Sequence, residues 1–506
     1  MSEPIRFRIF SIILSAVLLA ISATAAMAVE FTVKVDPSVV TDGQPLSGRL
    51  LIFMRKDDGK PSDGFGVNSR DPKAVWVSGI EIRNLEPGKP VIVDPDRLSF
   101  PSPFSTADAG SYQIFALLDR DHSYTYNGPG PGDVYSQVVK AAMPTAMAEL
   151  TLYKSIPERK PDIPANVRLI DLESSLLSAF WGRPVLMKAA VFLPPDYDGS
   201  KERYPVFYHI TGYGGTRFSA LRGAAQLTAD MTSGKRPPMI HVYLESQMSL
   251  GHHTWADSAN NGPWGTALAK ELIPYLEKQF RMDAKPSGRF LTGHSSGGWA
   301  TLWLMVTNPD LFGATWSTAP DPVDFRNFTG PDIYTAKNAY LRPEGGDYNL
   351  VRDKGTELMS IRQYAQRERV LGYYGGQFGA FNAVFSPKGP DGQPMQLFDI
   401  DTGRIDPEVA KAWEKYDISL LLRRNWATLG PKLKGKINII VGTADTFHLD
   451  ESVRLLDAEL KKLGSDARID YIEGKTHSDL YNDGLADRIA WEMYRLARPK
   501  ARAMAK

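Results

Sequence analysis

The sequence contains no cysteine among its 506 residues. This absence excludes disulfide bonds, thiolate metal sites and a cysteine nucleophile. An excess of charge of one sign is lacking as well, because 59 Lys and Arg residues against 58 Asp and Glu residues give a formal net charge of +1. Such a balance does not indicate an anionic partner, so we expect no binding of nucleic acid. A chain of this length can form more than one domain with its own hydrophobic core.

Long apolar runs are also missing, apart from one near the N-terminus, Ile9–Ile21. Arg6 and Arg8 precede this run and Ala26-Met27-Ala28 follows it, which is the pattern of a cleavable secretory signal. An uncleaved membrane anchor is the alternative, although the run is short for a membrane span. We therefore predict a signal peptide over residues 1–28 and a mature protein without a membrane span, located in the periplasm or secreted.

Short alternating apolar runs separated by turns fill residues 29–155. Examples are Phe31–Val35, Gly48–Phe53 and Ser111–Leu118. This spacing, with no helical periodicity between the runs, predicts an N-terminal all-β sandwich domain. Residues 156–165 are rich in proline and charge and are predicted to be a linker.

Three aspartates of the first domain lie close together in the sequence: Asp119, Asp121 and Asp133. Carboxylates at such spacing could bind a cation, but solvated side chains in turns are the simpler interpretation. We predict no metal site.

Continuous apolar strands alternate with helical segments over residues 166–506. This pattern predicts an α/β domain with a mostly parallel sheet covered by helices on both faces, and reacting groups beyond the carboxyl ends of the strands. The strands are expected at Val185–Leu193, Tyr204–Ile210, Met239–Leu244, Arg289–Gly293, Gly313–Ser317, Ile437–Gly442 and Ala467–Glu473.

One of these strands leads into Gly293-His294-Ser295-Ser296-Gly297, and an apolar segment typical of a buried helix follows. The motif G-x-S-x-G is weak alone, but between a strand and a helix it predicts a nucleophile elbow. Its glycines permit close crossing of strand and helix, and its central serine is held on a strained turn. Ser295 is therefore the candidate nucleophile.

A serine nucleophile needs a base and an acid, which follow it in the order Ser, Asp, His in α/β hydrolases. His477, just beyond the last predicted strand, is the candidate base, and His448 is an alternative. Asp445, directly beyond the preceding strand, is the candidate acid. Its rivals, Asp321 and Asp324, follow an earlier strand.

An oxyanion hole is expected in the glycine-rich turn Thr211–Gly215, which follows the strand ending at Ile210. A turn of this kind frees backbone N–H groups to face a developing oxyanion. The backbone N–H of Ser296 would supply the second donor.

The segment from Phe180 to Met493 resembles the putative esterase (esterase D-like) family of α/β hydrolases, to which enterochelin esterases, feruloyl esterases and mycolyltransferases are related. The matching stretches, besides the elbow, are Phe180–Pro184, Val191–Pro195, Tyr204–Tyr208, Ser258–Pro263 and Glu271–Pro274. The resemblance implies a triad of Ser295, Asp445 and His477, with oxyanion amides from Tyr213 and Ser296.

Two departures from the family pattern affect the expected substrate. Thr211-Gly212 stands where family members usually carry His-Gly, and a long insert over residues 320–432 separates two core strands. The insert contains Gly372–Gln377, Phe378–Phe385 and a helical stretch, Asp406–Leu422. We expect part of it to cover the site as a lid or wall.

Aromatic residues around the proposed site are candidates for substrate contact. Trp255 and Trp264 are expected to shape an apolar or sugar-stacking pocket, and Asn261 is a further candidate for substrate binding. His252 and His253 are expected at a loop rim rather than in a metal site, because adjacent side chains diverge.

The sequence predicts an exported serine esterase that hydrolyses a carboxylic ester through an acyl-enzyme on Ser295, without a cofactor. The substrate is expected to be a small-molecule or polymer-borne ester. Two alternatives remain open. One is acyl transfer by the same triad, and the other is a catalytically inactive hydrolase fold that binds carbohydrate or an envelope polymer.

Overall fold

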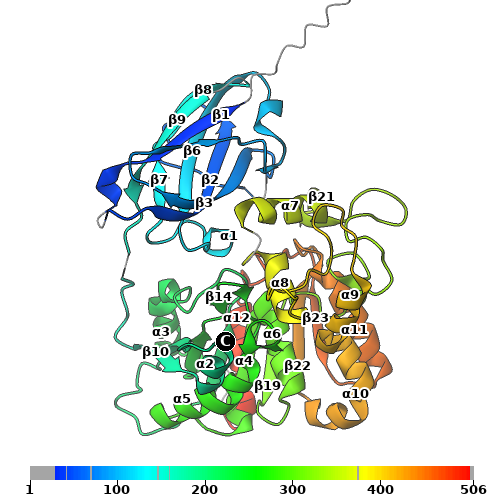
Figure 1. Ribbon diagram of the computed structural model, residues 1–506. Helices are drawn as coiled ribbons and strands as arrows, with labels where there is room; N and C mark the ends of the chain where they lie inside the picture. Colours follow the sequence, from blue (N-terminus) through cyan, green and yellow to red (C-terminus); the bar gives the residue numbers. More distant parts are fainter. Residues whose placement is uncertain are drawn as a thin grey trace, which may run out of the picture.

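The computed structural model describes residues 29–501 except 41–42, 69–70, 145–146, 159 and 373–374. The signal peptide predicted for residues 1–28 lies outside this range. Within it, no helix is both long and apolar enough to cross a membrane. Two large sheets form the molecule, one of nine strands in the first part of the chain and one of eight strands in the second (Figure 1).

The first sheet is mostly antiparallel, with one parallel pair, β1 with β9. Its strands are ordered β4-β1-β9-β7-β6-β2-β3-β5, and β8 also pairs with β6. They comprise β1 (Glu30–Val35), β2 (Leu46–Lys56), β3 (Val75–Leu85), β4 (Pro90–Val93), β5 (Ser99–Phe100), β6 (Gly110–Asp119), β7 (Val134–Ser136), β8 (Val139–Met143) and β9 (Met147–Ser155).

Alternating apolar residues of these strands point to one core. In β1, Phe31, Val33 and Val35 are buried and join side chains of β2, β6 and β9. The strands therefore form a single sheet curved around this core, where a sandwich would have two separate sheets. Alternation tells which side chains point inward, but not which strands pair, so the sequence could not distinguish the two arrangements.

The opposite face of β2 and β6 is also buried. Leu51, Phe53 and Phe115 pack in a second cluster with Val370 and Leu371, which belong to the second half of the chain. A short helix, α1 (Tyr124–Asn127), follows β6 on this side. Figure 1 shows α1 and α7 (Ile361–Leu371) between the nine-stranded sheet and the rest of the molecule. The two parts of the chain thus share an apolar interface.

The second sheet has the strand order β10-β11-β13-β12-β18-β19-β22-β23. β11 is antiparallel to both of its neighbours, and the strands from β13 to β23 are parallel. The strands are β10 (Val167–Glu173), β11 (Leu186–Phe192), β12 (Val206–Ile210), β13 (Ile240–Leu244), β18 (Arg289–His294), β19 (Ala314–Thr318), β22 (Ile437–Gly442) and β23 (Arg468–Ile472). This mixed sheet with helical crossovers is an α/β-hydrolase fold.

Helices connect most of these strands, and one of them, α6, is central. It begins at the elbow and is buried over nearly its whole length, as its apolar sequence requires. The connecting helices are α2 (Ser175–Trp181), α3 (Ala224–Thr232), α4 (Trp264–Ala267), α5 (Ile273–Gln279), α6 (Ser296–Thr307), α10 (Ile418–Leu433) and α11 (Leu449–Lys462), and α12 (Leu485–Ala497) follows the last strand. A π-helical turn, Leu268–Leu272, joins α4 to α5.

The long insert between β19 and β22 contains a small hairpin and several helices. In addition to α7, these elements are β20 (Asn349–Asp353) and β21 (Thr356–Ser360), which precede it, and α8 (Gln377–Phe385) and α9 (Pro407–Trp413), which follow it. A capping box of Ser360 and Gln363 begins α7. In Figure 1, α7 and β21 lie beside the nine-stranded sheet, and α8 lies below them, above β19 and β22 of the eight-stranded sheet.

Candidate active site

Ser295 stands at the junction of β18 and α6 in a backbone conformation that is rare for a residue with a side chain, φ 60° and ψ −126°. The strain is held by hydrogen bonds on both sides. The N–H of Ser295 donates to the carbonyl of Thr318 (3.0 Å), and the N–H of Asp321 donates to the carbonyl of Ser295 (3.2 Å). A Cβ atom at Gly297 would lie 2.1 Å from the carbonyl oxygen of Ile210, so only glycine permits this close crossing.

His477 follows β23 and pairs with Asp445, which follows β22. Nδ1 of His477 lies 2.8 Å from Oδ2 of Asp445, whose side chain is fully buried. Oδ1 of Asp445 accepts hydrogen bonds from the N–H groups of Phe447 (2.9 Å) and Leu449 (3.3 Å). Burial alone would raise the pKa of Asp445, but His477 and these donors outweigh burial and hold the pKa below its usual value. The carboxylate is therefore an ionised partner for an imidazole.

Two rings fix the orientation of the His477 side chain. The ring of His294 lies 4.3 Å from it, between centroids, and Phe447 meets it edge-on at 5.0 Å. Burial, followed by repulsion from His477, lowers the pKa of His294 to about 3. His294 is therefore neutral at ordinary pH, so it brings no second positive charge beside His477.

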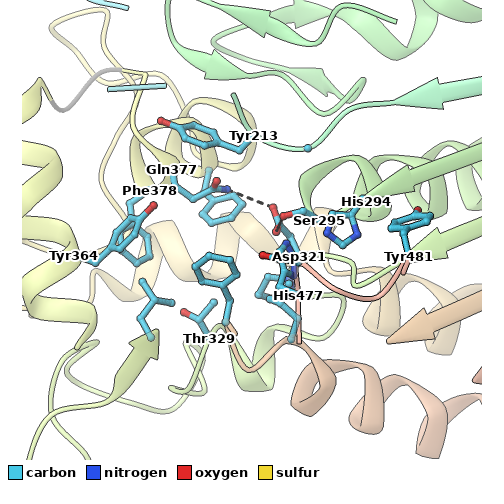
Figure 2. A pocket seen from close by; sticks show the side chains of 17 residues that line it. Tyr213, His294, Ser295, Asp321, Thr329, Tyr364, Gln377, Phe378, His477 and Tyr481 are labelled. Carbon is cyan, nitrogen blue, oxygen red and sulfur yellow. Dashed lines mark hydrogen bonds between the residues drawn. The ribbon is translucent and has the colours of Figure 1, made fainter. Parts of the chain in front are cut away.

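A cavity of about 480 Å³ opens over Ser295 and His477. Figure 2 shows Ser295, His294 and His477 on one side of it, facing Tyr364, Phe378 and Thr329 on the other. Most of the facing wall comes from the insert, as expected: Pro322, Thr329, Leu350, Tyr364, Gln377, Phe378 and Phe381. Apart from Gln377 and the hydroxyls of Thr329 and Tyr364, this wall is apolar.

Asp321, one of the rival acids, lies at the nucleophile rather than at the base. Its Oδ1 is 3.4 Å from the hydroxyl of Ser295, and its Oδ2 accepts a hydrogen bond from the hydroxyl of Ser296 at 2.5 Å. Gln377, at the start of α8, donates to the same Oδ2 (3.4 Å) and points toward Asp321 in Figure 2. Burial raises the pKa of Asp321 to about 6, despite the two hydroxyls.

The remaining alternatives lie outside the cavity lining. Asp324 is paired with the guanidinium of Arg326 (2.6 Å) and begins a short helical turn of the insert. His448 lies between Glu451 and Glu357 at the start of α11. Among the candidates for acid and base, the structure thus brings together Asp445 and His477.

The turn expected to supply the oxyanion hole approaches Ser295 closely. A Cβ atom at Gly212 would lie 3.2 Å from the Cβ of Ser295, and Tyr213 lines the cavity. Within the described residues, no backbone hydrogen bond uses the N–H of Tyr213 or that of Ser296 at the start of α6. Both groups are therefore free to donate to a ligand beside Ser295.

The residues predicted to contact substrate lie away from this cavity. Trp255 and Asn261 are fully buried, Trp264 is nearly so, and none of the three lines the cavity over Ser295. The indole N–H of Trp255 donates to Ser246 (3.0 Å), and that of Trp264 donates to the carbonyl of Asn261 (3.0 Å). The aromatic pattern was that of core packing, which sequence spacing alone does not separate from a binding pocket.

His252 and His253 are buried rather than at a loop rim. Nε2 of His252 lies 2.8 Å from the carbonyl oxygen of Thr211, and the ring of His253 stacks on Trp264 with centroids 3.8 Å apart. Burial lowers the pKa of His252 to about 4. Both imidazoles are thus neutral structural groups, and His252 contacts the turn that carries Tyr213.

Sequence reasoning missed the polar group formed by Asp321, Ser296 and Gln377. In the sequence, Asp321 is a rival acid at the start of the insert and Gln377 is a residue within the insert, and nothing there joins the two. The signal available was the position of Asp321 just beyond β19, where reacting groups gather in such sheets. The approach of Gln377 depends on how the insert folds back, which its sequence does not reveal.

Comparison with known proteins agrees with this architecture. A family model described as Putative esterase matches residues 184–493. An endo-1,4-beta-xylanase/feruloyl esterase of Xylanibacter ruminicola is 30% identical over 173 residues, covering 31% of this chain and 23% of that protein. An esterase of Mycobacterium tuberculosis is 36% identical over 163 residues, covering 31% and 34% respectively. The alignments thus span about a quarter to a third of the length of these relatives.

Solved structures with a similar chain path include a ferulic acid esterase, with a TM-score of 0.43 and 15% identity over 65% of this chain and 98% of that chain. Another is an S-formylglutathione hydrolase from Agrobacterium tumefaciens, with a TM-score of 0.39 and 17% identity over 65% and 95%. The family model covers well over half of the sequence and includes the elbow, Asp445 and His477. The chain belongs to the putative esterase family.

Proposed function

We propose that the protein is an exported serine esterase that hydrolyses carboxylic esters through an acyl-enzyme on Ser295. The observation that carries this proposal is the Asp445–His477 pair, with 2.8 Å between its polar atoms, in the same cavity as a serine on a strained elbow. An elbow, a paired imidazole and free backbone donors together are the requirements for acyl transfer through serine.

In the proposed reaction, the hydroxyl of Ser295 turns from Asp321 toward His477 and attacks the ester carbonyl while Nε2 of His477 takes its proton. The carbonyl oxygen becomes an oxyanion and accepts hydrogen bonds from the N–H groups of Tyr213 and Ser296. The C–O bond to the alcohol then breaks, and the alcohol leaves with the proton from His477. Water attacks the acyl-enzyme in the same way and releases the acid.

The electrostatics of the site support these roles. Asp445 remains ionised, so it holds the proton on Nδ1 of His477 and stabilises the imidazolium that forms during attack. His294 remains neutral beside it and does not oppose that charge. One oxyanion donor typically contributes about 3 kcal/mol to transition-state stabilisation, so the two backbone groups matter as much as the triad.

The cavity supports an ester with an apolar or aromatic group. Leu350, Phe378, Phe381 and Phe447 lie around the space next to Ser295, which suits an acyl chain or an aromatic acid more than a bare sugar. One relative is named as a feruloyl esterase, and one similar structure as a ferulic acid esterase. For this chain, we propose a small-molecule or polymer-borne ester whose apolar part fills this cavity.

Labelling with an organophosphonate, followed by peptide mass spectrometry, tests the proposal. The probe should modify Ser295 in the wild type and nothing in Ser295→Ala. p-Nitrophenyl esters of graded chain length and feruloyl esters should then be hydrolysed. A protein that is neither labelled nor active would instead be a binding protein with a hydrolase fold. Product formed mainly on an added alcohol, with little free acid, would identify an acyltransferase.

A further inference from the structure

The side chain of Tyr213 connects the oxyanion turn to two distant parts of the chain. Its phenolic oxygen lies 2.6 Å from the carbonyl oxygen of Gly375, in the insert, and 3.1 Å from that of Thr125, in α1. One phenolic proton is thus shared between two carbonyl acceptors. Burial, followed by repulsion from Glu368, raises the pKa of Tyr213 well above its usual value. The phenol therefore stays protonated and keeps donating.

The backbone of the same turn packs directly on α1. Gly214 has a φ of +76°, and a Cβ atom there would lie 2.6 Å from the carbonyl oxygen of Tyr126. A Cβ atom at Gly375 of the insert would lie 2.9 Å from the ring of the same Tyr126. The turn, α1 and the insert thus meet with no space for a side chain between them.

Buried aspartates brace α1 from the nine-stranded sheet. Asp119, the last residue of β6, accepts hydrogen bonds from the N–H groups of Ser123 (3.1 Å) and Tyr124 (3.0 Å). Asp133 accepts from the N–H groups of Arg120 (3.0 Å) and Gly130 (2.8 Å). Two of the three carboxylates that the sequence offered as a possible cation site, Asp119 and Asp133, therefore fix α1, which presents Thr125.

The insert is fixed to the same sheet. Arg49 of β2 donates from Nη2 to the carbonyls of Arg369 (3.0 Å) and Val370 (2.8 Å), at the end of α7. This caps the carboxyl end of α7, where a cation is favourable. Val370 and Leu371 pack beside Arg49 on the face of the nine-stranded sheet that is opposite to its own core. Glu368 of α7 accepts hydrogen bonds from the N–H of Phe378 (3.2 and 3.1 Å), three residues after Gly375, so the position of this segment also depends on α7 and on the sheet that holds it.

We propose that the N-terminal sheet is a structural part of the oxyanion hole and that the hydroxyl of Tyr213 is the link. The backbone N–H of Tyr213 receives the oxyanion, while its side chain, held by α1 and the insert, fixes where that N–H points. Tyr213 is then a positioning residue through its side chain. This inference rests on the proposed esterase function.

Tyr213→Phe tests the link, because it keeps the ring and the backbone N–H and removes the hydroxyl. Loss of an oxyanion donor costs about 10²–10³ in kcat, so a loosened donor should lower kcat by roughly 10- to 100-fold with little change in KM. Affinity for a boronic acid inhibitor, whose adduct places an oxygen in the oxyanion hole, should fall by a similar factor. Tyr124→Phe removes a hydroxyl from the same helix and should leave both quantities unchanged.

Arg49→Met tests the same link from the sheet. It should lower kcat and inhibitor affinity together by roughly threefold or more, while Ser295 remains open to the organophosphonate. Thermal unfolding checks that each variant is folded. Wild-type kcat and inhibitor affinity in both Tyr213→Phe and Arg49→Met would overturn the inference. Failure of the proposed function would look different, because the wild-type protein itself would be inactive and unlabelled.

An independent observation concerns the buried carboxylate of Asp321, which is 6% exposed. Its Oδ2 has donors in Ser296 and Gln377, whereas the donor to Oδ1 is the hydroxyl of Ser295 at 3.4 Å. The described residues that line the cavity include no lysine or arginine. Asp321 therefore relies on hydrogen bonds, and one of them comes from the nucleophile itself.

Acylation removes that donor, because the oxygen of Ser295 then carries the acyl group and has no proton. A buried carboxylate oxygen left without a donor is unfavourable. We infer that Oδ1 of Asp321 is a subsite for a hydrogen-bond donor, a hydroxyl or an ammonium group, on the acyl part of the substrate. At 3.4 Å from the Ser295 oxygen, Oδ1 is within reach of a group close to the ester carbonyl. This inference also rests on the proposed function.

Three ethyl esters of similar size test whether Oδ1 of Asp321 binds a donor on the acyl part. They are the ethyl esters of propanoic, 2-hydroxypropanoic and 2-aminopropanoic acid. Hydrolysis of each ester is measured in a pH-stat by the acid that it releases. The wild type should prefer at least one donor-bearing ester by about tenfold or more in kcat/KM. Asp321→Asn keeps an acceptor without charge, so it should retain a preference for the hydroxyl and lose one for the ammonium.

Equal kcat/KM for all three esters in the wild type would overturn the inference that Oδ1 of Asp321 binds a donor on the substrate. So would an Asp321→Asn variant that loses the same factor on each ester, since a general structural role would have that effect. Asp324→Asn, three residues along the chain but outside the cavity, should leave the preference of the wild type unchanged. If the wild type hydrolyses no ester and Ser295 resists labelling, the proposed function fails instead.

Discussion

Replacing Asp321 by asparagine should make the folded protein more stable at alkaline pH, although the residue lies in the active site. The pKa of this carboxyl is raised from 3.8 to about 6 by burial. Above that pH the carboxylate is charged in both the folded and the unfolded chain, and the folded chain bears the full cost of burying the charge. A shift of about two units corresponds to about 3 kcal/mol.

This cost disappears in acid. As pH falls through 6, the folded protein takes up a proton that the unfolded chain binds only near 3.8, so the native carboxyl regains stability. Asn carries no charge at any pH and can still accept the hydrogen bond of Ser296. Asp321→Asn should therefore raise the free energy of unfolding by up to about 3 kcal/mol at about pH 8, and the gain should vanish by about pH 4.

Differential scanning fluorimetry at the two pH values measures the difference. A gain of this size corresponds to a rise in Tm on the order of 5 °C. Asp324→Asn is a matched control, because Asp324 is equally buried but pairs with Arg326 at 2.6 Å. Loss of that pair should lower Tm. An Asp321→Asn variant with the same Tm shift at both pH values, or a lower Tm at alkaline pH, would refute the reasoning.

Other predictions concern the triad and export. Ser295→Ala should lower kcat by roughly 10⁴-fold or more, measured with p-nitrophenyl esters; retention of a tenth of the activity would contradict the acyl-enzyme. Asp445→Asn should lower kcat on the order of 10⁴-fold at similar KM, because the amide favours the wrong tautomer of His477; near-normal kcat would remove Asp445 from the triad. Mass spectrometry of the exported protein should find a mature N-terminus at or near Val29, whereas an intact Met1 in the membrane fraction would indicate an anchor.

The catalytic fold could be predicted from the sequence because its strands are continuous apolar runs. The ranges expected for seven strands of the eight-stranded sheet agree with the structure to within a few residues; these strands are β11, β12, β13, β18, β19, β22 and β23. The edge strand β10 was missed, because its sequence, Val167–Glu173, alternates apolar and charged residues and lacks such a run. Reacting groups in parallel sheets lie just beyond the carboxyl ends of the strands. Asp445 and His477 follow neighbouring strands, so they could be expected to meet.

The substrate side of the site could not be predicted in the same way. The cavity wall is made by Tyr364, Phe378 and Phe381 of the insert, and their approach to Ser295 depends on tertiary packing against the nine-stranded sheet. Trp255 and Trp264 were expected to shape a pocket, but their rings pack on each other in the core. Local patterns define elements and turns, whereas which surface an insert covers depends on contacts distant in sequence.

The linkage through Tyr213 has a consequence for biosynthesis. The contacts that hold the oxyanion turn join residues 88 and 162 positions apart in the chain. Contacts of such long range form late in folding, after the segments on both sides have been synthesised. An esterase built in this way has no working site while the chain is emerging from the ribosome. Hydrolytic activity would arise only once the nine-stranded sheet, the insert and the strands that carry the triad have assembled.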